Sequence, residues 1–367
     1  MGDRNAKPTR ADTSPRYPLL DALRVVAMLD IVAVHVGHRY LLEGIGLPVF
    51  IITAVALATR RPRLPAWHTL GAAAGKRARR VLVPWLVWTA VFAVTRAWSG
   101  LRSDESTVAG SFYPWMVVSG TSIHLWFLPF IFVAEMAVLA ALALAPGNGR
   151  KKSRVRGVIP AAAVAAVAAV WLTGRVYDHV GAVQGFAVDS PVYAERAARW
   201  AWLTQKSWLF GLASAALGVV VGRTLAASTT AGSARPRRIL LVAAAAACGL
   251  YVYWAARDRG ALPGWPDPIH GHAIWQWWRQ SAALLAVALA VQLTGRTPAW
   301  LYRLALTTLG IYLVHGWVNV TLLPPLDRTV PYFAEATQTF HGRVAVVWTL
   351  SLVLVILLRR TLVRRVL

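Results

Sequence analysis

The chain has 367 residues, of which 57% are apolar and only 15% are charged. A soluble protein of this length would divide into two or three domains and carry more charge, so the composition excludes that class. The chain instead contains successive apolar runs of about 16–25 residues, the length that spans the hydrocarbon core of a bilayer. The sequence therefore predicts an all-α, polytopic integral membrane protein.

In chain order, a polar tail over residues 1–17 precedes one membrane domain over residues 18–360, and a short basic tail over residues 361–367 follows it. About ten transmembrane helices are expected within the domain. Their predicted ranges are 19–40, 44–59, 81–98, 122–146, 158–173, 207–226, 238–256, 275–294, 304–323 and 343–358. The polar segments between these runs are short, so no separate soluble domain is expected.

The net charge of +24 is distributed unevenly between the two sides of the expected membrane domain. If both termini are cytoplasmic, 26 Lys and Arg residues lie in inner segments, and 12 lie in outer segments or at outer helix ends. Two acidic residues lie inside and ten outside. This asymmetry follows the positive-inside rule and predicts cytoplasmic termini. The basic runs face anionic lipid and cytoplasm, so a nucleic-acid partner is not expected.

The first predicted span carries four ionisable residues, Asp21, Arg24, Asp30 and His35. Each such group costs at least about 2.5–3.5 kcal/mol at the centre of a membrane helix, and so these groups usually line an interior or a water-filled path. At about 100° per residue, Arg24 and His35 lie within about 20° of each other around the helix. Asp21 falls on the same side, and Asp30 points away. One face of this helix is therefore predicted to be a polar stripe about 16 Å long.

Two further spans contribute basic, aromatic and acidic residues. The third opens with KRARRVLVP, in which Arg77 and Arg80 are three residues apart and so share one helix face. The fourth begins with IHLWF, which contains His124 and Trp126. Glu135 follows eleven residues after His124 and lies on the same helix face. His124, Trp126 and Glu135 are candidates for lining a site.

The ninth span contains IYLVHGW, which places Tyr312 and His315 on one face and Asn319 one turn beyond. His35 lies about 24 Å from the inner end of the first span, in its outer half. An inward-running fourth span and an outward-running ninth span bring His124 and His315 to a similar level. The three histidines are therefore expected to share one depth. His124 and His315 either line a site or hydrogen-bond a neighbouring helix.

Four of these motifs occur in the same order in a known family. They are the D-x-x-R…H pattern of Asp21, Arg24 and His35, the R-x-x-R-l-x-x-P pattern of Arg77, Arg80 and Pro84, and the strings HLWFL and IYLVH. Over essentially all of its membrane region the chain resembles the membrane-bound acyltransferase-3 family, which O-acylates sugars and other acceptors. It is similar to the standalone form of that family, without a C-terminal periplasmic hydrolase-like domain.

The resemblance implies a function and roles for individual residues. It implies functional roles for Arg24 and His35, and it matches Arg77 and Arg80 to the inner arginine pair of the family. It further implies a cytoplasmic acyl-CoA donor, acetyl-CoA by default, and an acceptor modified at the outer side of the bacterial cytoplasmic membrane. A cell-envelope polysaccharide, a glycolipid and a glycosylated small metabolite all remain open as acceptors.

The chemistry of these residues agrees with that direction of transfer. CoA is strongly anionic at its phosphates, and guanidinium groups bind phosphate oxygens bidentately, so Arg77 and Arg80 are predicted to hold the donor. An acceptor hydroxyl needs a base before it attacks a thioester, and His35 is predicted to remove that proton. Transient acylation of His35 is the alternative. Arg24, preceded by Asp21, would orient the donor or balance developing charge.

The remaining ionisable residues suggest structural roles. A lone carboxylate near the middle of the membrane pairs with an arginine or is protonated, and Arg24 is the expected structural partner of Glu135. His270 and His272 are too few for a metal site, so no metal or permanently bound cofactor is expected. The single Cys248 excludes an intrachain disulfide.

Two other classes of protein compete with the acyltransferase interpretation. Polytopic glycosyltransferases often carry a pair of acids in the first outer loop, whereas this loop is minimal and holds only Glu43. A transporter or flippase of a lipid-linked or anionic substrate would account for a polar path through the membrane. It would not require Arg77 and Arg80 on the cytoplasmic side together with a histidine near the outer side. Binding of acyl-CoA distinguishes the acyltransferase from the transporter.

Overall fold

The computed structural model describes residues 17–37, 42, 44–60, 69–102, 121–122, 124–144, 151–186, 209–258 and 272–361, and all regular structure within them is helical. The two predicted tails lie almost wholly outside these residues, as do Glu43 and His270. The helices are α1 (Pro18–Gly37), α2 (Gly46–Thr59), α3 (Leu70–Arg102), α5 (Phe127–Leu144), α6 (Lys151–Phe186), α8 (Leu209–Ala231), α9 (Arg235–Asp258), α10 (His272–Ala290), α11 (Ala299–Trp317), α12 (Leu323–Thr329), α13 (Pro331–Thr337) and α14 (Phe340–Leu358), with a π-helical segment η4 (Val318–Leu322) between α11 and α12.

Each of the ten predicted apolar runs overlaps one of these helices, which confirms the all-α polytopic class, although α3 and α6 extend well beyond the predicted ranges. Among the described residues, seven helices are long and apolar enough to cross a membrane. The count of ten spans stays a prediction, because α2 has only 14 residues and α1 and α10 carry more polar residues. The polar helices are not peripheral, since Asp30 in α1 and Gln276, Arg279 and Gln280 in α10 are all buried.

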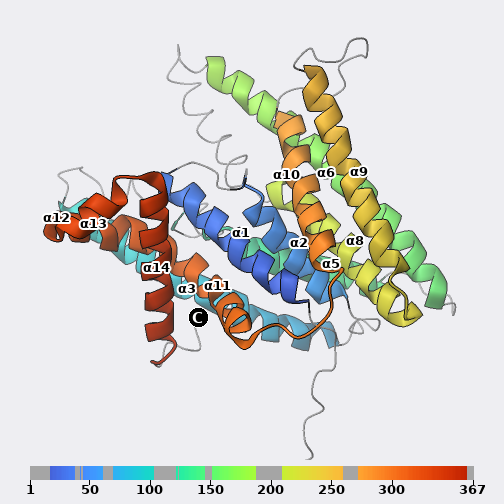
Figure 1. Cartoon of the computed structure of the whole chain (residues 1–367), viewed down its shortest axis with the longest axis horizontal. Helices are drawn as coiled ribbons and strands as arrows, with labels where there is room; N and C mark the ends of the chain where they lie inside the picture. The colour runs from blue at the N-terminus through green and yellow to red at the C-terminus, as the bar shows by residue number, and fades with distance from the viewer. Residues whose placement is uncertain are drawn as a thin grey trace, which may run out of the picture.

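α1 lies near the centre of the helical arrangement (Figure 1). It packs against α2 on one side and against α11 and α14 on the other. One hydrophobic core joins α1 to α3, α5, α11 and α14, and a second joins α2, α8, α9 and α10. Apolar side chains that face outward, such as Val94 in α3, Val164 in α6 and Val242 in α9, are exposed in the protein, as expected of surfaces that contact hydrocarbon.

The contact between α2 and α8 depends on two glycines. Gly218 and Gly222 are four residues apart and so lie on one face of α8. A Cβ atom on Gly218 would lie 2.6 Å from Cβ of Val55, and one on Gly222 would lie 2.6 Å from the carbonyl oxygen of Ala56. Small residues at this spacing let membrane helices approach closely, which is how helices associate where apolar burial alone provides no driving force.

The turn between α1 and α2 is held from both sides by buried charged residues. Asp30 accepts hydrogen bonds from the backbone N–H of Leu42 at 2.7 Å and of Gly46 at 2.9 Å. Arg279 of α10 donates to the carbonyl oxygen of Gly44 from Nε at 3.0 Å and from a terminal nitrogen at 2.6 Å. Gly44 has a φ of 71°, a conformation that favours glycine. As the sequence predicted, Asp30 points away from the polar stripe, and its bond to Gly46 holds the start of α2 against α1.

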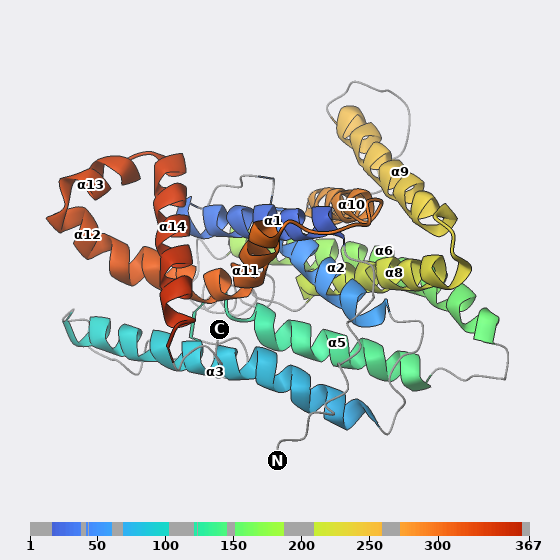
Figure 2. The same ribbon diagram turned by 60° about the horizontal axis from the view of Figure 1, so that its bottom comes forward.

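The last part of the chain forms a helical arm. Figure 2 shows α12 and α13 beyond α14, while α3 and α5 run side by side on another face. Gly37 at the end of α1 meets the start of α14, since a Cβ atom there would lie 2.7 Å from Cδ2 of Phe340. The end of α1 that carries His35 therefore lies against the first turn of α14.

Candidate active site

Three histidines that are far apart in the sequence are in ring contact. His35 is in α1, His124 lies in the turn before α5, and His315 is in the last turn of α11. The ring centroids of His35 and His124 are 5.7 Å apart, those of His35 and His315 are 5.0 Å apart, and those of His124 and His315 are 4.8 Å apart. The expectation that they share one depth is confirmed. These three residues are called the histidine cluster below.

The hydrogen bonds of the cluster indicate which ring nitrogens carry protons. Nδ1 of His35 lies 2.7 Å from the carbonyl oxygen of Ile31, and Nδ1 of His315 lies 2.8 Å from that of Tyr312. A carbonyl oxygen only accepts, so both histidines donate from Nδ1, and in the neutral ring Nε2 is left with the basic lone pair. Nε2 of His124 and of His315 are buried and have no hydrogen-bond partner among the described residues.

Two neighbours shape the position of His124. The hydroxyl of Tyr312 donates to the carbonyl oxygen of His124, and Phe92 of α3 contacts the His124 ring at a centroid distance of 5.2 Å. Gly316 leaves room for the same ring, because a Cβ atom there would lie 2.6 Å from Cε1 of His124. Sequence reasoning selected Tyr312 and missed Gly316, although the glycine directly follows His315.

Asn319 connects the cluster to α14. It lies in η4, and its Nδ2 donates to the carbonyl oxygen of His35 at 3.3 Å. Its Oδ1 accepts a hydrogen bond from Arg343 at 3.3 Å. π-Helical segments are rare and occur frequently at functional sites. Sequence reasoning did not select Arg343, because α14 reads as an ordinary apolar span after its first turn.

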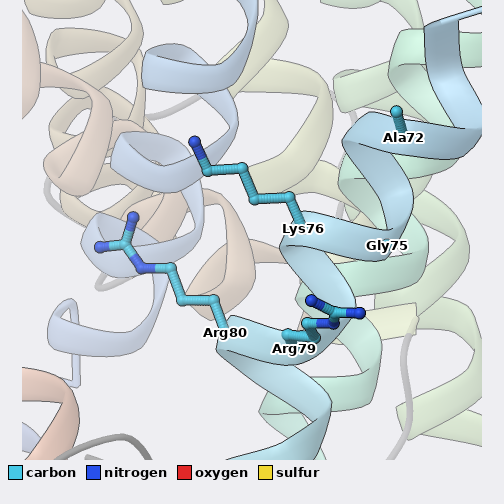
Figure 3. Close-up of a pocket in the computed structure, with 5 residues that line it drawn as sticks. All are labelled: Ala72, Gly75, Lys76, Arg79 and Arg80. Carbon is cyan, nitrogen blue, oxygen red and sulfur yellow. The ribbon is translucent and has the colours of Figure 1, made fainter.

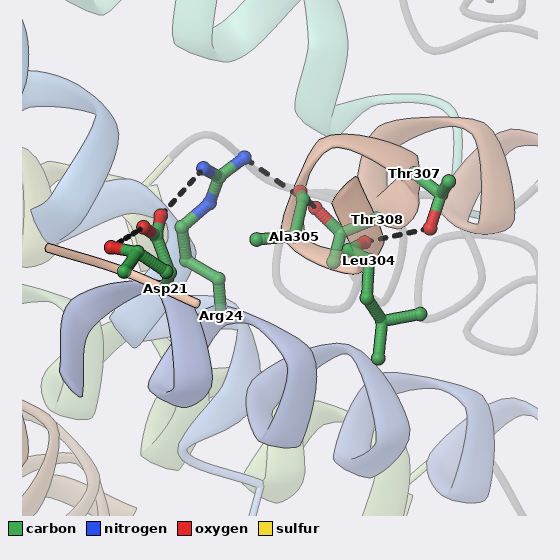
Figure 4. Close-up of polar contacts among 7 residues, drawn as sticks. Asp21, Arg24, Leu304, Ala305, Thr307 and Thr308 are labelled. Atoms are coloured by element: carbon green, nitrogen blue, oxygen red, sulfur yellow. Dashed lines mark hydrogen bonds and ion pairs between the residues drawn. The ribbon is translucent and has the colours of Figure 1, made fainter. Parts of the chain in front are cut away.

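Arg24 lies at a different level of α1, about 16 Å along the helix from His35. It is 3.8 Å from Asp21 and donates to the hydroxyl of Thr308 at 3.5 Å, while Thr297 donates to Asp21 at 2.8 Å (Figure 4). These contacts join α1 to α11 and to the segment before it. The predicted grouping of Asp21 with Arg24 is confirmed.

The expected pair of Glu135 with Arg24 is wrong. Glu135 of α5 instead forms a hydrogen-bonded ion pair with Arg77 of α3. The Glu135 side chain is 2% exposed and that of Arg77 is 26% exposed, so the pair is largely shielded from solvent. The reason is the helix arrangement. α5 runs alongside α3, which brings Glu135 to Arg77, whereas Arg24 donates a hydrogen bond to Thr308 of α11.

An open hollow of about 660 Å³ lies on the N-terminal part of α3 (Figure 3). It is lined by Ala72, Gly75, Lys76, Arg79 and Arg80 and is called the cationic hollow below. Lys76 and Arg80 extend from the same side of the helix in Figure 3. Arg77 and Arg80, which were predicted to act as a pair, therefore have different surroundings. Arg80 lines the hollow, whereas Arg77 forms an ion pair with Glu135.

The charge of Arg80 reaches both neighbouring ion pairs. It interacts unfavourably with the charge of Arg24 and favourably with that of Glu135. The cationic hollow therefore lies in the neighbourhood of both ion pairs. Trp126, the remaining candidate, is buried and stacks edge-on against Phe130 at 5.7 Å in the first core.

The site is thus built at two levels that α1 connects. Met28 and Ile31 lie between Arg24 and His35 and are buried. In the part of the chain that the structure describes, no group of three or more His, Cys, Asp or Glu side chains is arranged to hold a metal ion.

The apolar helices that the structure describes define a multi-pass membrane protein. A family model described as an acyltransferase domain (Acyl_transf_3) matches residues 17–360. The chain therefore belongs to the acyltransferase-3 family, and the protein is a multi-pass membrane acyltransferase. A search of curated proteins and a search of solved structures each found no match.

Proposed function

We propose that the protein transfers an acyl group, by default acetyl, from cytoplasmic acyl-CoA to a hydroxyl of a sugar or glycoconjugate at the outer side of the bacterial cytoplasmic membrane. The observation that carries this proposal is a site at two levels. Arg80 of the cationic hollow on α3 interacts with Arg24 of α1, and the histidine cluster lies toward the other end of α1. Family membership favours this enzyme over a transporter or a glycosyltransferase.

The donor binds at the cationic hollow. Lys76, Arg79 and Arg80 supply donors for the CoA phosphates, which arginine binds bidentately. Arg77 acts indirectly, since its ion pair with Glu135 holds α3 against α5. An extended acyl-pantetheine arm covers a distance comparable to the separation of about 16 Å between Arg24 and His35. Arg24 is therefore too far from the thioester to balance its charge, and it orients the donor.

His35 is the general base for the transfer. Its Nδ1–H donates to Ile31, which fixes the tautomer with the lone pair on Nε2. Nε2 removes the proton of the acceptor hydroxyl as the oxygen attacks the thioester carbonyl. The C–S bond then breaks, CoA leaves as a thiolate, and the proton held by His35 passes to the thiolate. The ester remains on the acceptor.

The test measures binding and turnover of radiolabelled acetyl-CoA by purified protein in nanodiscs. We expect R79Q/R80Q to weaken binding by about tenfold or more, because charge-assisted hydrogen bonds are lost. The matched control is R235Q/R238Q, which removes two exposed arginines from α9 on the same predicted side. We expect H35A to bind acetyl-CoA normally and to release no CoA above background. Well-folded wild-type protein that binds neither acetyl-CoA nor longer acyl-CoAs would contradict the proposal.

A further inference from the structure

The first turn of α14 carries a cation that the proposed mechanism does not use. Arg343 donates to Oδ1 of Asn319 at 3.3 Å, and Asn319 donates to the backbone carbonyl of His35 at 3.3 Å. The guanidinium of Arg343 is therefore one side chain away from the proposed base. It reaches this place because the end of α1 meets the start of α14 at Gly37 and Phe340.

The guanidinium of Arg343 is incompletely satisfied. Its Nε is buried and has no hydrogen-bond partner among the described residues, and no described carboxylate lies within 4.0 Å of it. Its bond to Asn319 goes to a neutral amide oxygen and is long. A partly buried guanidinium without an anion loses hydration that such an acceptor does not replace. The group that best completes it is a carboxylate or a phosphate, bound by two parallel N–H donors.

Several other buried or half-buried arginines of the described chain have evident structural partners, although Nε of Arg77, Arg223 and Arg237 also lacks a hydrogen-bond partner there. Arg24 and Arg77 lie beside carboxylates, and Arg279 donates twice to Gly44. Arg237 donates to carbonyl oxygens at the C-terminal end of α10, where a cation is stabilised by the helix dipole. Arg343 has the opposite location, in the first turn of a helix, where the dipole disfavours a positive charge. Helix stability therefore does not explain Arg343.

Topology does not explain Arg343 either. The charge distribution places the start of α14 on the outer side, where Lys and Arg are depleted. The donor phosphates are expected at the opposite level of the protein, at the cationic hollow. A cation that is close to the histidine cluster, on the outer side and without a carboxylate has the location expected of an acceptor-binding group.

We propose that Arg343, with Asn319, forms a subsite for an oxyanion on the acceptor, a phosphate or a carboxylate attached to the sugar that is acylated. This inference rests on the proposed function and names the substrate class of that site. The anion is bound and stays unchanged, while a hydroxyl of the same sugar reaches His35. The acceptor is thereby selected by charge as well as by its sugar ring.

The test compares three soluble probes that differ in charge, namely glucose 1-phosphate, glucuronate and methyl glucoside. Their affinities are measured by thermal shift on protein in phosphatidylcholine nanodiscs, so that no anionic lipid competes. We expect wild-type protein to bind at least one anionic probe about tenfold or more tightly than methyl glucoside. R343Q should lose this preference, and R343K should keep part of it, because lysine retains the charge without the bidentate fork.

Two control variants locate the anion. R359Q removes an arginine at the other end of α14, where it donates to the carbonyl oxygen of Leu306, and should leave the preference unchanged. R80Q should also leave it unchanged, while weakening acetyl-CoA binding. The subsite is overturned if wild-type protein binds anionic probes no more tightly than methyl glucoside, if R343Q keeps the preference, or if R80Q alone removes it.

Acetyl-CoA binding on the same preparations separates this proposal from the proposed function. R343Q should bind acetyl-CoA like wild type and melt within a few degrees of it. If acetyl-CoA binds but R343Q leaves the anion preference intact, the subsite fails and the enzyme proposal stands. If wild-type protein does not bind acetyl-CoA but its anion preference depends on Arg343, the proposed function fails and the anion subsite stands.

Discussion

The histidine cluster, which three segments of the chain build, and the cationic hollow, which α3 alone lines, differ in burial and in rigidity. In the cluster, His124 and His315 are almost fully buried, the rings contact one another, and backbone carbonyls orient Nδ1 of His35 and His315. The hollow is open, and its Lys76, Arg79 and Arg80 extend from one helix. Histidine rings that hold a proton-transfer geometry need rigid support, whereas cations that receive a flexible anionic donor do not.

This difference divides mutational effects between the two levels. Substitutions in the cluster are expected to change turnover, because they alter the position of the base. Substitutions at the cationic level are expected to change donor affinity or stability, because they remove charge or an ion pair. The following variants test that division.

The largest effect on turnover is expected from H35A. Loss of a general base typically lowers turnover by about 10²–10⁴-fold, and acetyl-CoA binding should be retained. The measurement is acetyl transfer and CoA release by purified protein, with H341A as the control, since His341 is exposed. If H35A keeps more than a tenth of wild-type turnover, His35 is not the base.

A large loss of stability without a matching loss of chemistry is expected from E135Q. The change leaves Arg77 beside a neutral group in a largely shielded pair, and we expect a cost of about 2 kcal/mol. Thermal unfolding measures this cost, and E335Q is the control, because Glu335 is exposed. A double-mutant cycle with R77Q measures the interaction free energy between Glu135 and Arg77. A normal melting temperature with abolished turnover would assign Glu135 to the chemistry instead.

G316A tests how closely the cluster is packed. The added methyl group meets the His124 ring, so the ring must move, at a cost of about 1–3 kcal/mol. We expect lower turnover together with a lower melting temperature. G249A is the matched control, because a Cβ atom there meets nothing within 4 Å. Equal behaviour of the two variants would show that His124 has room to shift.

The smallest effect is expected from T308A at the cationic level. The bond from Arg24 to Thr308 is 3.5 Å long, so its loss should cost less than about 1 kcal/mol. We expect acetyl-CoA affinity to fall by no more than about threefold, with turnover at saturating donor unchanged. T307A is the control, because the Thr307 hydroxyl donates to the carbonyl oxygen of Leu304 within α11. A selective loss of turnover in T308A would place Arg24 in the chemical step.

The helices and the common depth of the histidines followed from the sequence. A single apolar run that crosses a bilayer forms an α-helix, because its backbone N–H and C=O groups must be hydrogen-bonded within the segment. The helical repeat then placed Asp21, Arg24 and His35 on one side of α1 and Asp30 on another. Alternating span directions predicted that His124 and His315 lie at the level of His35, and the structure shows in addition that the rings are in contact.

Only the tertiary structure decided which helices are neighbours. Apolar helices present similar surfaces to one another, so periodicity assigns a face and a depth to each residue but no partner. The partner of Glu135 is Arg77 because α5 lies along α3, and the clearance for His124 depends on Gly316. Arg343 reaches Asn319 because α14 begins where α1 ends. The sequence by itself determined the class, the presence of the apolar helices and the polar face of α1, and helix packing determined which of those polar residues meet.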